Sequence, residues 1–247
     1  LQAEFTILNV VRIEGPSKAN LKLKHIEKML VTAAEEEGAA LVRQLRADVK
    51  GDYKLTFKAV RGHTVTREVI GFTEKNPTNM VVMGSRGASA LKKARMGGTT
   101  VSVIDDAEVP VLAIPEFAQY KNLDRIVYAS DLKNVQKELE ILTEFAEIYG
   151  AHIHMIHVVP AVDKKTEIAR QAVEDLLRKM KYDKVDFRII IDENVPAAID
   201  QFIKETKADL LTTFTHHLNI FEKLFARSVT RTLAYLGSIP LLALKRK

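Results

Sequence analysis

The chain of 247 residues contains no cysteine and no tryptophan, and its uninterrupted apolar runs are only a few residues long. The absence of cysteine excludes disulfide bonds, thiolate catalysis and zinc–thiolate sites, and it fits a reducing cytoplasm. A membrane-spanning helix needs about 20 consecutive apolar residues, so no segment of this sequence is expected to cross a bilayer. We therefore expect a cytoplasmic protein without a membrane anchor.

The basic residues do not cluster as they do in nucleic-acid-binding proteins. Lys and Arg exceed Asp and Glu by 37 to 32, but the excess is scattered and forms no long basic run interleaved with aromatic residues. Hydrophobic residues make up 47% of the chain, which is enough for one large domain or two small cores. No nucleic-acid partner is expected.

Two parts of the chain resemble each other, which indicates an internal repeat. The matching segments are 109–114 with 239–244 and 79–82 with 209–212 at an offset of 130, and 3–11 with 151–159 at an offset of 148. The difference between the offsets leaves 18 extra residues in the first copy. We predict two domains, a first repeat over 1–116 and a second repeat over 121–247.

The second repeat alternates short apolar strands with amphipathic helices. The expected strands are 123–129, 153–159, 185–191, 210–213 and 239–244, and the expected helices include 135–149, 168–177, one entered at 194–196, and 224–235. Such alternation predicts crossover connections and a parallel sheet with helices on both faces. The fold class is therefore α/β, with two doubly wound parallel-sheet units in tandem.

The first repeat follows the same order from its second strand onward. We expect a strand over 5–11, a long helix over 18–49 and an alternating strand over 53–59. The 18 extra residues fall in the helix, which then either protrudes as an arm or breaks near Gly38. The first repeat lacks an equivalent of the strand and helix over 123–150, and we expect the native gene to encode upstream residues that supply them.

A glycine-rich basic stretch, MGSRGASALKKARMGGTT over 83–100, follows a short apolar strand in the first repeat. Ligands of open parallel α/β sheets lie at the carboxyl ends of strands, where the N–H groups of the next helix can bind anions. Gly84 and Gly87 allow backbone conformations that are closed to other residues, and Arg86 adds positive charge. The pattern fits a phosphate-binding loop, and the glycine spacing alone fits a basic surface loop without a ligand equally well.

The spacing Gly84-x2-Gly87-x9-Gly97 resembles the G-x2-G-x9-G-[ST] signature of the ATP-binding branch of the universal stress protein family. The repeat and the sequence Ala129-Ser130-Asp131-Leu132 after the first strand of the second repeat are similar to tandem members of that family. The resemblance implies five-stranded units of the adenine nucleotide alpha hydrolase type, with segments 109–114 and 239–244 paired, and it allows a homodimer. It also implies that an adenine nucleotide, with ATP as the first choice, is the ligand. The implied nucleotide-binding residues are Gly84, Arg86, Gly87, Gly97, Gly98, Thr99, Thr100, Val10 and Val11, with Asp131, Val158, Ser228 and Thr230 as weaker candidates in the second repeat.

Two departures from the family pattern bear on these sites. Gly98 stands where the family has Ser or Thr, so a hydroxyl that would donate to phosphate is missing, and Thr99 or Thr100 is left to replace it. At the positions equivalent to the three glycines, the second repeat carries Phe214, His217 and Arg227. Large side chains fill the space that a phosphate needs, so we expect no nucleotide loop there.

Histidines of the second repeat suggest a metal site, because His152-x-His154 places two rings on one face of a strand. The alternative is that His157 is an ordinary residue at a strand end and that His216 and His217 belong to a solvated loop. We expect no metal site, and His152, at the strand start, is the weakest candidate. Asp131 could likewise cap the following helix instead of binding a ligand.

No nucleophile elbow, no Ser–His–acid set and no Walker lysine is present, so dedicated catalysis is not expected. The leading interpretation is a stress-response or regulatory protein in which a nucleotide orders the 84–100 loop and changes the surface presented to an unidentified protein partner. The first alternative is a nucleotide-independent dimeric scaffold. The second is a slow ATP hydrolase, which would need a metal-holding acid near Gly97.

Overall fold

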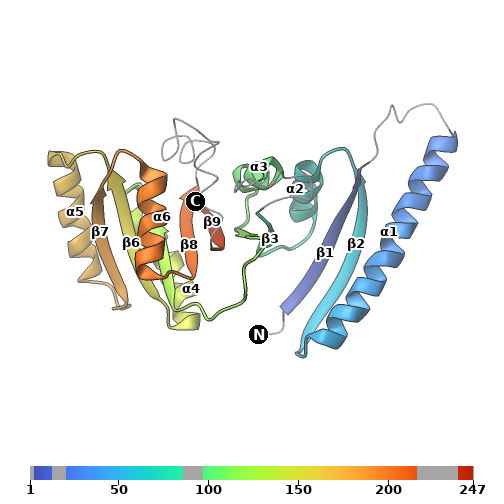
Figure 1. Cartoon of the computed structure of the whole chain (residues 1–247), viewed down its shortest axis with the longest axis horizontal. Coiled ribbons are helices and arrows are strands. Elements are labelled where there is room, and N and C mark those ends of the chain that lie inside the picture. Colours follow the sequence, from blue (N-terminus) through green and yellow to red (C-terminus); the bar gives the residue numbers. More distant parts are fainter. Residues whose placement is uncertain (1–2, 13–20, 86–96, 216–238, 247) are drawn as a thin grey trace. The chain divides into compact units, whose positions relative to one another are not determined.

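The computed structural model describes residues 3–12, 21–85, 97–215 and 239–246 (Figure 1). These residues divide into two compact units, Leu1–Pro77 and Thr78–Lys247. This division follows contacts within the folded chain, whereas the repeats over 1–116 and 121–247 follow sequence similarity. The repeat boundaries therefore stay a prediction.

The N-terminal compact unit is a two-stranded parallel sheet with two helices. Its elements are β1 (Ala3–Arg12), α1 (Leu21–Asp48), β2 (Tyr53–Gly62) and α2 (Val65–Lys75). β1 and β2 pair over their whole length, with Ala3 opposite Tyr53 and Arg12 opposite Gly62. Among the described residues β1 pairs with β2 alone.

Helix α1 runs unbroken through Gly38, so the alternative of a break at this glycine is wrong. A Cβ atom added at Gly38 would lie 2.2 Å from the ring of Phe57 on β2, and a side chain there would therefore push the helix off the sheet. The helix is also tied to β2 by Arg46, whose Nη2 donates to the carbonyl of Leu55 at 2.9 Å. The glycine thus serves close helix–sheet packing.

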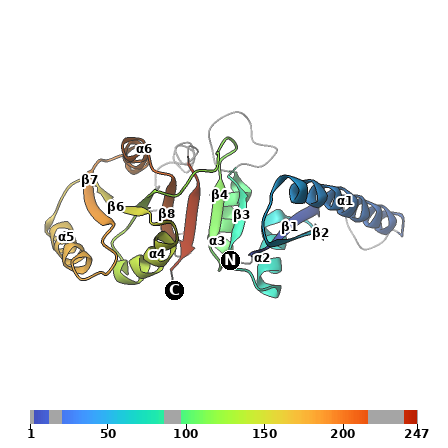
Figure 2. The same cartoon turned by 90° about the horizontal axis from the view of Figure 1, so that it is seen from below.

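The C-terminal compact unit is a seven-stranded sheet in the order β3-β4-β9-β8-β5-β6-β7. Its elements are β3 (Val81–Gly84), α3 (Gly98–Asp106), β4 (Val111–Ile114), β5 (Arg125–Ala129), α4 (Val135–Tyr149), β6 (His152–Val159), α5 (Lys164–Leu177), β7 (Val185–Ile191), α6 (Val195–Thr206), β8 (Leu210–Thr215) and β9 (Leu241–Lys245). Helices α4 and α5 lie on one face of the β5–β8 part and α6 lies on the other (Figure 2). The predicted α/β class with parallel sheets covered by helices is confirmed. The helix predicted over 224–235 lies outside the described residues.

Equivalent strands of the two repeats pair in equal registers. Val81 lies opposite Val111 in β3–β4, and the same pair shifted by 130 residues, Leu211 and Leu241, is opposed in β8–β9. The pairs Phe5–Leu55 in β1–β2 and Ile153–Val185 in β6–β7 agree in the same way, with shifts of 148 and 130. The offsets seen in the sequence therefore preserve the geometry of both strand pairs.

The segments 109–114 and 239–244, which the family resemblance pairs with each other, contribute β4 and β9. These strands are neighbours and run antiparallel, whereas all other pairs in the sheet are parallel. Leu112 lies opposite Leu242, its own equivalent in the other repeat. The pairing of β4 with β9 is thus symmetric about the Leu112–Leu242 pair.

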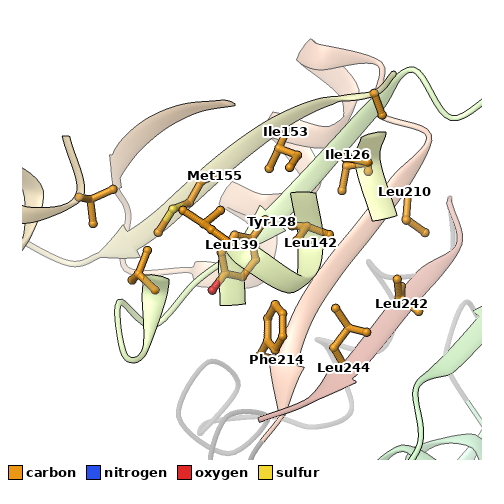
Figure 3. Close-up of a cluster of buried hydrophobic side chains, with 14 residues drawn as sticks. Ile126, Tyr128, Leu139, Leu142, Ile153, Met155, Leu210, Phe214, Leu242 and Leu244 are labelled. Atoms are coloured by element: carbon orange, nitrogen blue, oxygen red, sulfur yellow. The ribbon is translucent and has the colours of Figure 1, made fainter. Parts of the chain in front are cut away.

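The core of the second repeat fills the space between the sheet and helix α4 (Figure 3). Helix α4 contributes Leu139 and Leu142, both fully buried, at the spacing expected of one helix face. The rings of Tyr128 on β5 and Phe214 on β8 meet edge to face with centroids 5.7 Å apart. Within the described part of the chain, no helix combines the length and apolar character needed to cross a membrane.

Candidate functional site

The end of β3 and the start of α3 are joined by a compact set of hydrogen bonds. The N–H of Ser85 donates to Ile114 O at 2.7 Å, and the N–H of Gly97 donates to Ser85 O at 2.7 Å. The hydroxyl of Thr100 donates to Gly84 O at 2.9 Å. These bonds fix the first turn of α3 beside the carboxyl end of β3, although residues 86–96, with Arg86 and Gly87, lie outside the described residues.

The first turn of α3 offers backbone donors without a competing group among the described residues. Gly97 is the N-cap and supplies no side chain to accept from the N–H groups that follow. The first turn carries no acidic residue, and a Cβ atom at Gly98 would meet nothing within 4 Å. Because a helix N-terminus carries a partial positive charge, this turn can bind an anion such as a phosphate.

The glycines act here by leaving space, since none of those described at the junction needs a special backbone conformation. Among the described glycines only Gly150 has a positive φ, so Gly84 does not use the conformational freedom that a glycine allows. Gly97 has φ −69° and ψ 144°, which any residue can adopt. Of the two hydroxyls left to replace the missing one, that of Thr100 is buried on Gly84 and that of Thr99 is exposed.

The expected adenine-pocket residues Val10 and Val11 lie at the end of β1, in the N-terminal compact unit. Both are half-buried and pair with Val60 and Arg61 of β2. Their counterpart in the second repeat, Val158, occupies the equivalent place near the end of β6 and is buried.

In the second repeat, Asp131 is bound by an arginine that the sequence did not single out. Arg246 Nη2 lies 2.7 Å from Asp131 Oδ1, and Nη1 lies 3.2 Å from Oδ2. The Nε group of the same arginine donates to Glu138, whose other oxygen accepts from the hydroxyl of Tyr128. The side chains of Arg246 and Glu138 are 6% and 2% exposed, so the carboxylate of Asp131 faces an internal cation.

Burial and ion pairing shift the pKa values of the two carboxyl groups in this network in opposite directions. Burial raises the pKa of Asp131, but the hydrogen bond and charge of Arg246 and the N–H of Lys133 outweigh it and hold the pKa below its ordinary value. For Glu138 burial dominates, and its pKa is raised although Tyr128 and Arg246 pull it down. Burial and the nearby Glu138 raise the pKa of Tyr128 well above its ordinary value. The folded protein therefore favours the charged form of Asp131 and disfavours that of Glu138.

Phe214 stands at the position equivalent to Gly84 and turns its ring into the core beside Tyr128 (Figure 3). The remaining second-repeat candidates, His217, Arg227, Ser228 and Thr230, lie outside the described residues. His157 donates through Nδ1 to the carbonyl of Ser130 at 2.8 Å, and His216 lies outside the described residues. His152 and His154 instead meet Asp186, a residue that the sequence patterns did not single out.

Comparison with known proteins places part of the chain in a family. Residues 1–115, which cover almost all of the first repeat, match the model of the universal stress protein family. No curated protein matches the chain. Residues 1–115 are therefore similar to this family.

Solved structures share the fold of nearly the whole chain. A universal stress protein from Archaeoglobus fulgidus DSM 4304 is 21% identical with a TM-score of 0.69, covering 99% of this chain and 86% of its own. A putative universal stress protein from Pseudomonas aeruginosa UCBPP-PA14 is 13% identical with a TM-score of 0.63, covering 97% of this chain and 92% of its own. A universal stress protein solved in complex with cAMP is 17% identical with a TM-score of 0.39 and covers 50% of this chain and 98% of its own.

Proposed function

We propose that the protein is a tandem universal stress protein that binds an adenine nucleotide, ATP in the first place, at the β3–α3 junction of the first repeat. The family match over 1–115 supports the adenine nucleotide as ligand. The equal strand registers of the two repeats support the tandem arrangement. Binding, without dedicated catalysis, is the activity.

The observation that carries the proposal is the set of backbone N–H donors in the first turn of α3. Its N-cap has no side chain, its first turn has no acidic residue, and among the described residues no atom lies within 4 Å of a Cβ placed at Gly98. The hydrogen bonds from Ser85, Gly97 and Thr100 hold this turn in place before a ligand arrives. A preformed set of N–H donors at the end of a parallel strand is the usual way in which α/β folds bind phosphate groups.

The second repeat does not offer the same site. Phe214 replaces the first glycine of the loop, and Arg246 neutralises Asp131, the acid that the family resemblance assigns to the nucleoside. A nucleotide would have to displace a buried arginine that also compensates Glu138. One nucleotide per chain is therefore expected.

The nucleotide acts by shifting a conformational equilibrium. Phosphate groups bound at the first turn of α3 favour one arrangement of the protein over others. A partner that binds that arrangement then distinguishes the nucleotide-bound protein from the free one. The first turn of α3 has no carboxylate to hold a metal ion for hydrolysis.

The test is a calorimetric titration of the full chain with ATP, ADP, AMP and cAMP, using variants of Gly98. Gly98→Glu places a negative charge at the helix N-terminus, where it repels the phosphate groups and occupies the favourable position for an anion. ATP binding is expected to weaken about tenfold, since the interaction of a charge with a helix terminus contributes about 1 kcal/mol or more to the free energy. Gly98→Ser restores a donor hydroxyl and is expected to tighten binding about three- to tenfold. Both side chains enter open space, so neither is expected to disturb the fold.

Gly71→Glu is the matched control, because a Cβ atom at Gly71 on α2 also meets nothing within 4 Å. It carries the same charge change and should leave ATP affinity unchanged. Equal affinity of Gly98→Glu and Gly71→Glu would contradict the assigned site. No binding at millimolar ATP would contradict nucleotide binding itself and leave the dimeric scaffold as the function.

A further inference from the structure

Three side chains at the start of β6 and β7 gather on the face that α6 covers. His152 and His154 alternate along β6, and Asp186 lies directly opposite His154 on β7. His152 Nε2 and His154 Nδ1 lie 2.9 and 2.6 Å from the same oxygen, Asp186 Oδ2. The two imidazole rings stack with centroids 4.5 Å apart.

Hydrogen bonding alone satisfies this cluster poorly. Both rings bond to Oδ2 of Asp186, while Oδ1 is shielded from solvent and has no hydrogen-bond partner within the described part of the chain. Buried carboxylate oxygens are nearly always paired, so an unpaired one calls for an explanation. A cation on this carboxylate would compensate its charge, since buried charges in proteins are paired or coordinate metals.

We propose that His152, His154 and Asp186 bind one divalent transition-metal ion, and that zinc is the ion that fits best. Two imidazole nitrogens and one carboxylate oxygen are a ligand set that zinc accepts, with water in the fourth position. The three ligand atoms lie within 4.8 Å of one another. Donors on a tetrahedral zinc ion are about 3.3 Å apart, so each His–Asp pair opens by only about half an ångström to admit the ion.

The surroundings hold the ligands in place and leave a path for the ion. β6 lies inside the seven-stranded sheet and β7 is hydrogen-bonded to it at the sheet edge, and the ring of Phe202 packs edge to face on His154. Arg188, the nearest cation along β7, stacks over Phe202 with 5.7 Å to the ring centroid. The side chains of His152, His154 and Asp186 are 40%, 16% and 36% exposed, which leaves the open coordination position to water.

The fold itself does not require this trio. In the first repeat the positions equivalent to His154 and Asp186 are Thr6 and Thr56, which face each other in the same register and share a hydrogen bond of 3.1 Å. The equivalent of His152 is Glu4, which pairs with Lys54. The strand pair of the first repeat therefore forms with two threonines at the positions of His154 and Asp186. The ligand set is thus specific to the second repeat. The site lies at the start of the strands and is independent of nucleotide binding.

The test measures zinc binding to the full chain by competition with a chromophoric chelator, and cobalt binding by visible absorption. The native protein should bind one zinc ion, and cobalt should give the intense bands of a tetrahedral site. The variants His152→Gln, His154→Gln and Asp186→Asn should each lower zinc affinity about 100-fold or more, since even outer-shell changes cost 10–100-fold. His157→Gln is the control, because this histidine on the same strand donates to Ser130 instead, and it should change nothing.

Circular dichroism checks that each variant folds, and His152, as the most exposed ligand, provides a variant that the core does not depend on. Absence of zinc binding by the native protein would overturn the proposal. Unchanged affinity in folded His152→Gln and His154→Gln, or an equal loss in His157→Gln, would overturn it too, because the ion would then lie elsewhere.

Discussion

Removing the charge of Arg246 tests the buried ion network of the second repeat. Arg246→Met keeps much of the apolar stem but leaves the carboxylate of Glu138, which is 2% exposed, without its cation. Removing one partner of a buried ion pair costs about 3 to 5 kcal/mol. With about 2 to 4 °C per kcal/mol for a chain of this size, the unfolding midpoint should fall by roughly 6 to 20 °C.

The measurement is thermal and urea unfolding followed by circular dichroism, since the chain has no tryptophan. Arg178→Met is the matched control, because Arg178 is 70% exposed and forms an exposed ion pair with Asp175, so its loss should cost less than about 1 kcal/mol. Adding Glu138→Gln to Arg246→Met removes the uncompensated charge and should restore most of the lost stability. If Arg246→Met unfolds like Arg178→Met, or if Glu138→Gln does not rescue it, the network does not stabilise the fold as argued.

The pH dependence gives a second check of the same network. The pKa of Asp131 is lowered in the folded protein, so its contribution is present above about pH 4 and is lost as the pH falls through the folded value. The pKa of Glu138 is raised, so the folded state holds its proton more tightly and its contribution falls as the pH rises from about 4 through the raised value. Without Arg246 both pKa values move up, and the deficit of Arg246→Met should be larger at pH 8 than at pH 5. A deficit that does not vary with pH would refute this reasoning.

Two further substitutions test the end of helix α6 and the packing of helix α4. Lys207→Gly should stabilise the protein by about 0.5 kcal/mol, measured by urea unfolding, because Lys207 ends α6 with φ 51° and ψ 45°, a conformation that favours glycine. Leu142→Ala should lower the free energy of unfolding by about 2 to 5 kcal/mol, because Leu142 is fully buried against the sheet. An unchanged stability of Leu142→Ala would contradict the burial of this leucine in the core. A loss of stability in Lys207→Gly would contradict the left-handed conformation at the end of α6.

The alternation of strands and helices was predictable because local periodicity determines it. Apolar residues of α4 recur at helical spacing, and Gly150 ends that helix with φ 64°, as the sequence indicates. The internal repeat adds long-range information, since segments that match at a constant offset occupy equivalent places. It relates segment 109–114 to segment 239–244, and these two form the neighbouring strands β4 and β9.

The buried networks were not predictable in the same way. Asp131 and Arg246 are 115 positions apart, and neither pattern nor spacing connects them. Asp186 is a single acidic residue in a strand, which from sequence alone is interpreted as a surface residue. Only the strand register shows that His154 lies opposite it. Gly38 carried a helix-breaking signal, but the ring of Phe57 on the neighbouring strand decides its role. In each case the deciding contact depends on which elements become neighbours.

The two repeats show which positions the fold fixes and which it leaves open. Strand registers agree pair by pair, so the hydrogen-bonded sheet constrains where residues stand. The side chains at equivalent positions are free to differ: the carbonyl of Gly84 accepts from Thr100 at the start of α3, whereas Phe214 packs on Tyr128 in the core. Thr6 and Thr56 bond to each other, whereas His154 and Asp186 gather with a third polar group. One repeat can therefore keep an anion site at the carboxyl ends of its strands while the other acquires a metal site at their start, and the variants of Gly98 and of His152 should act independently.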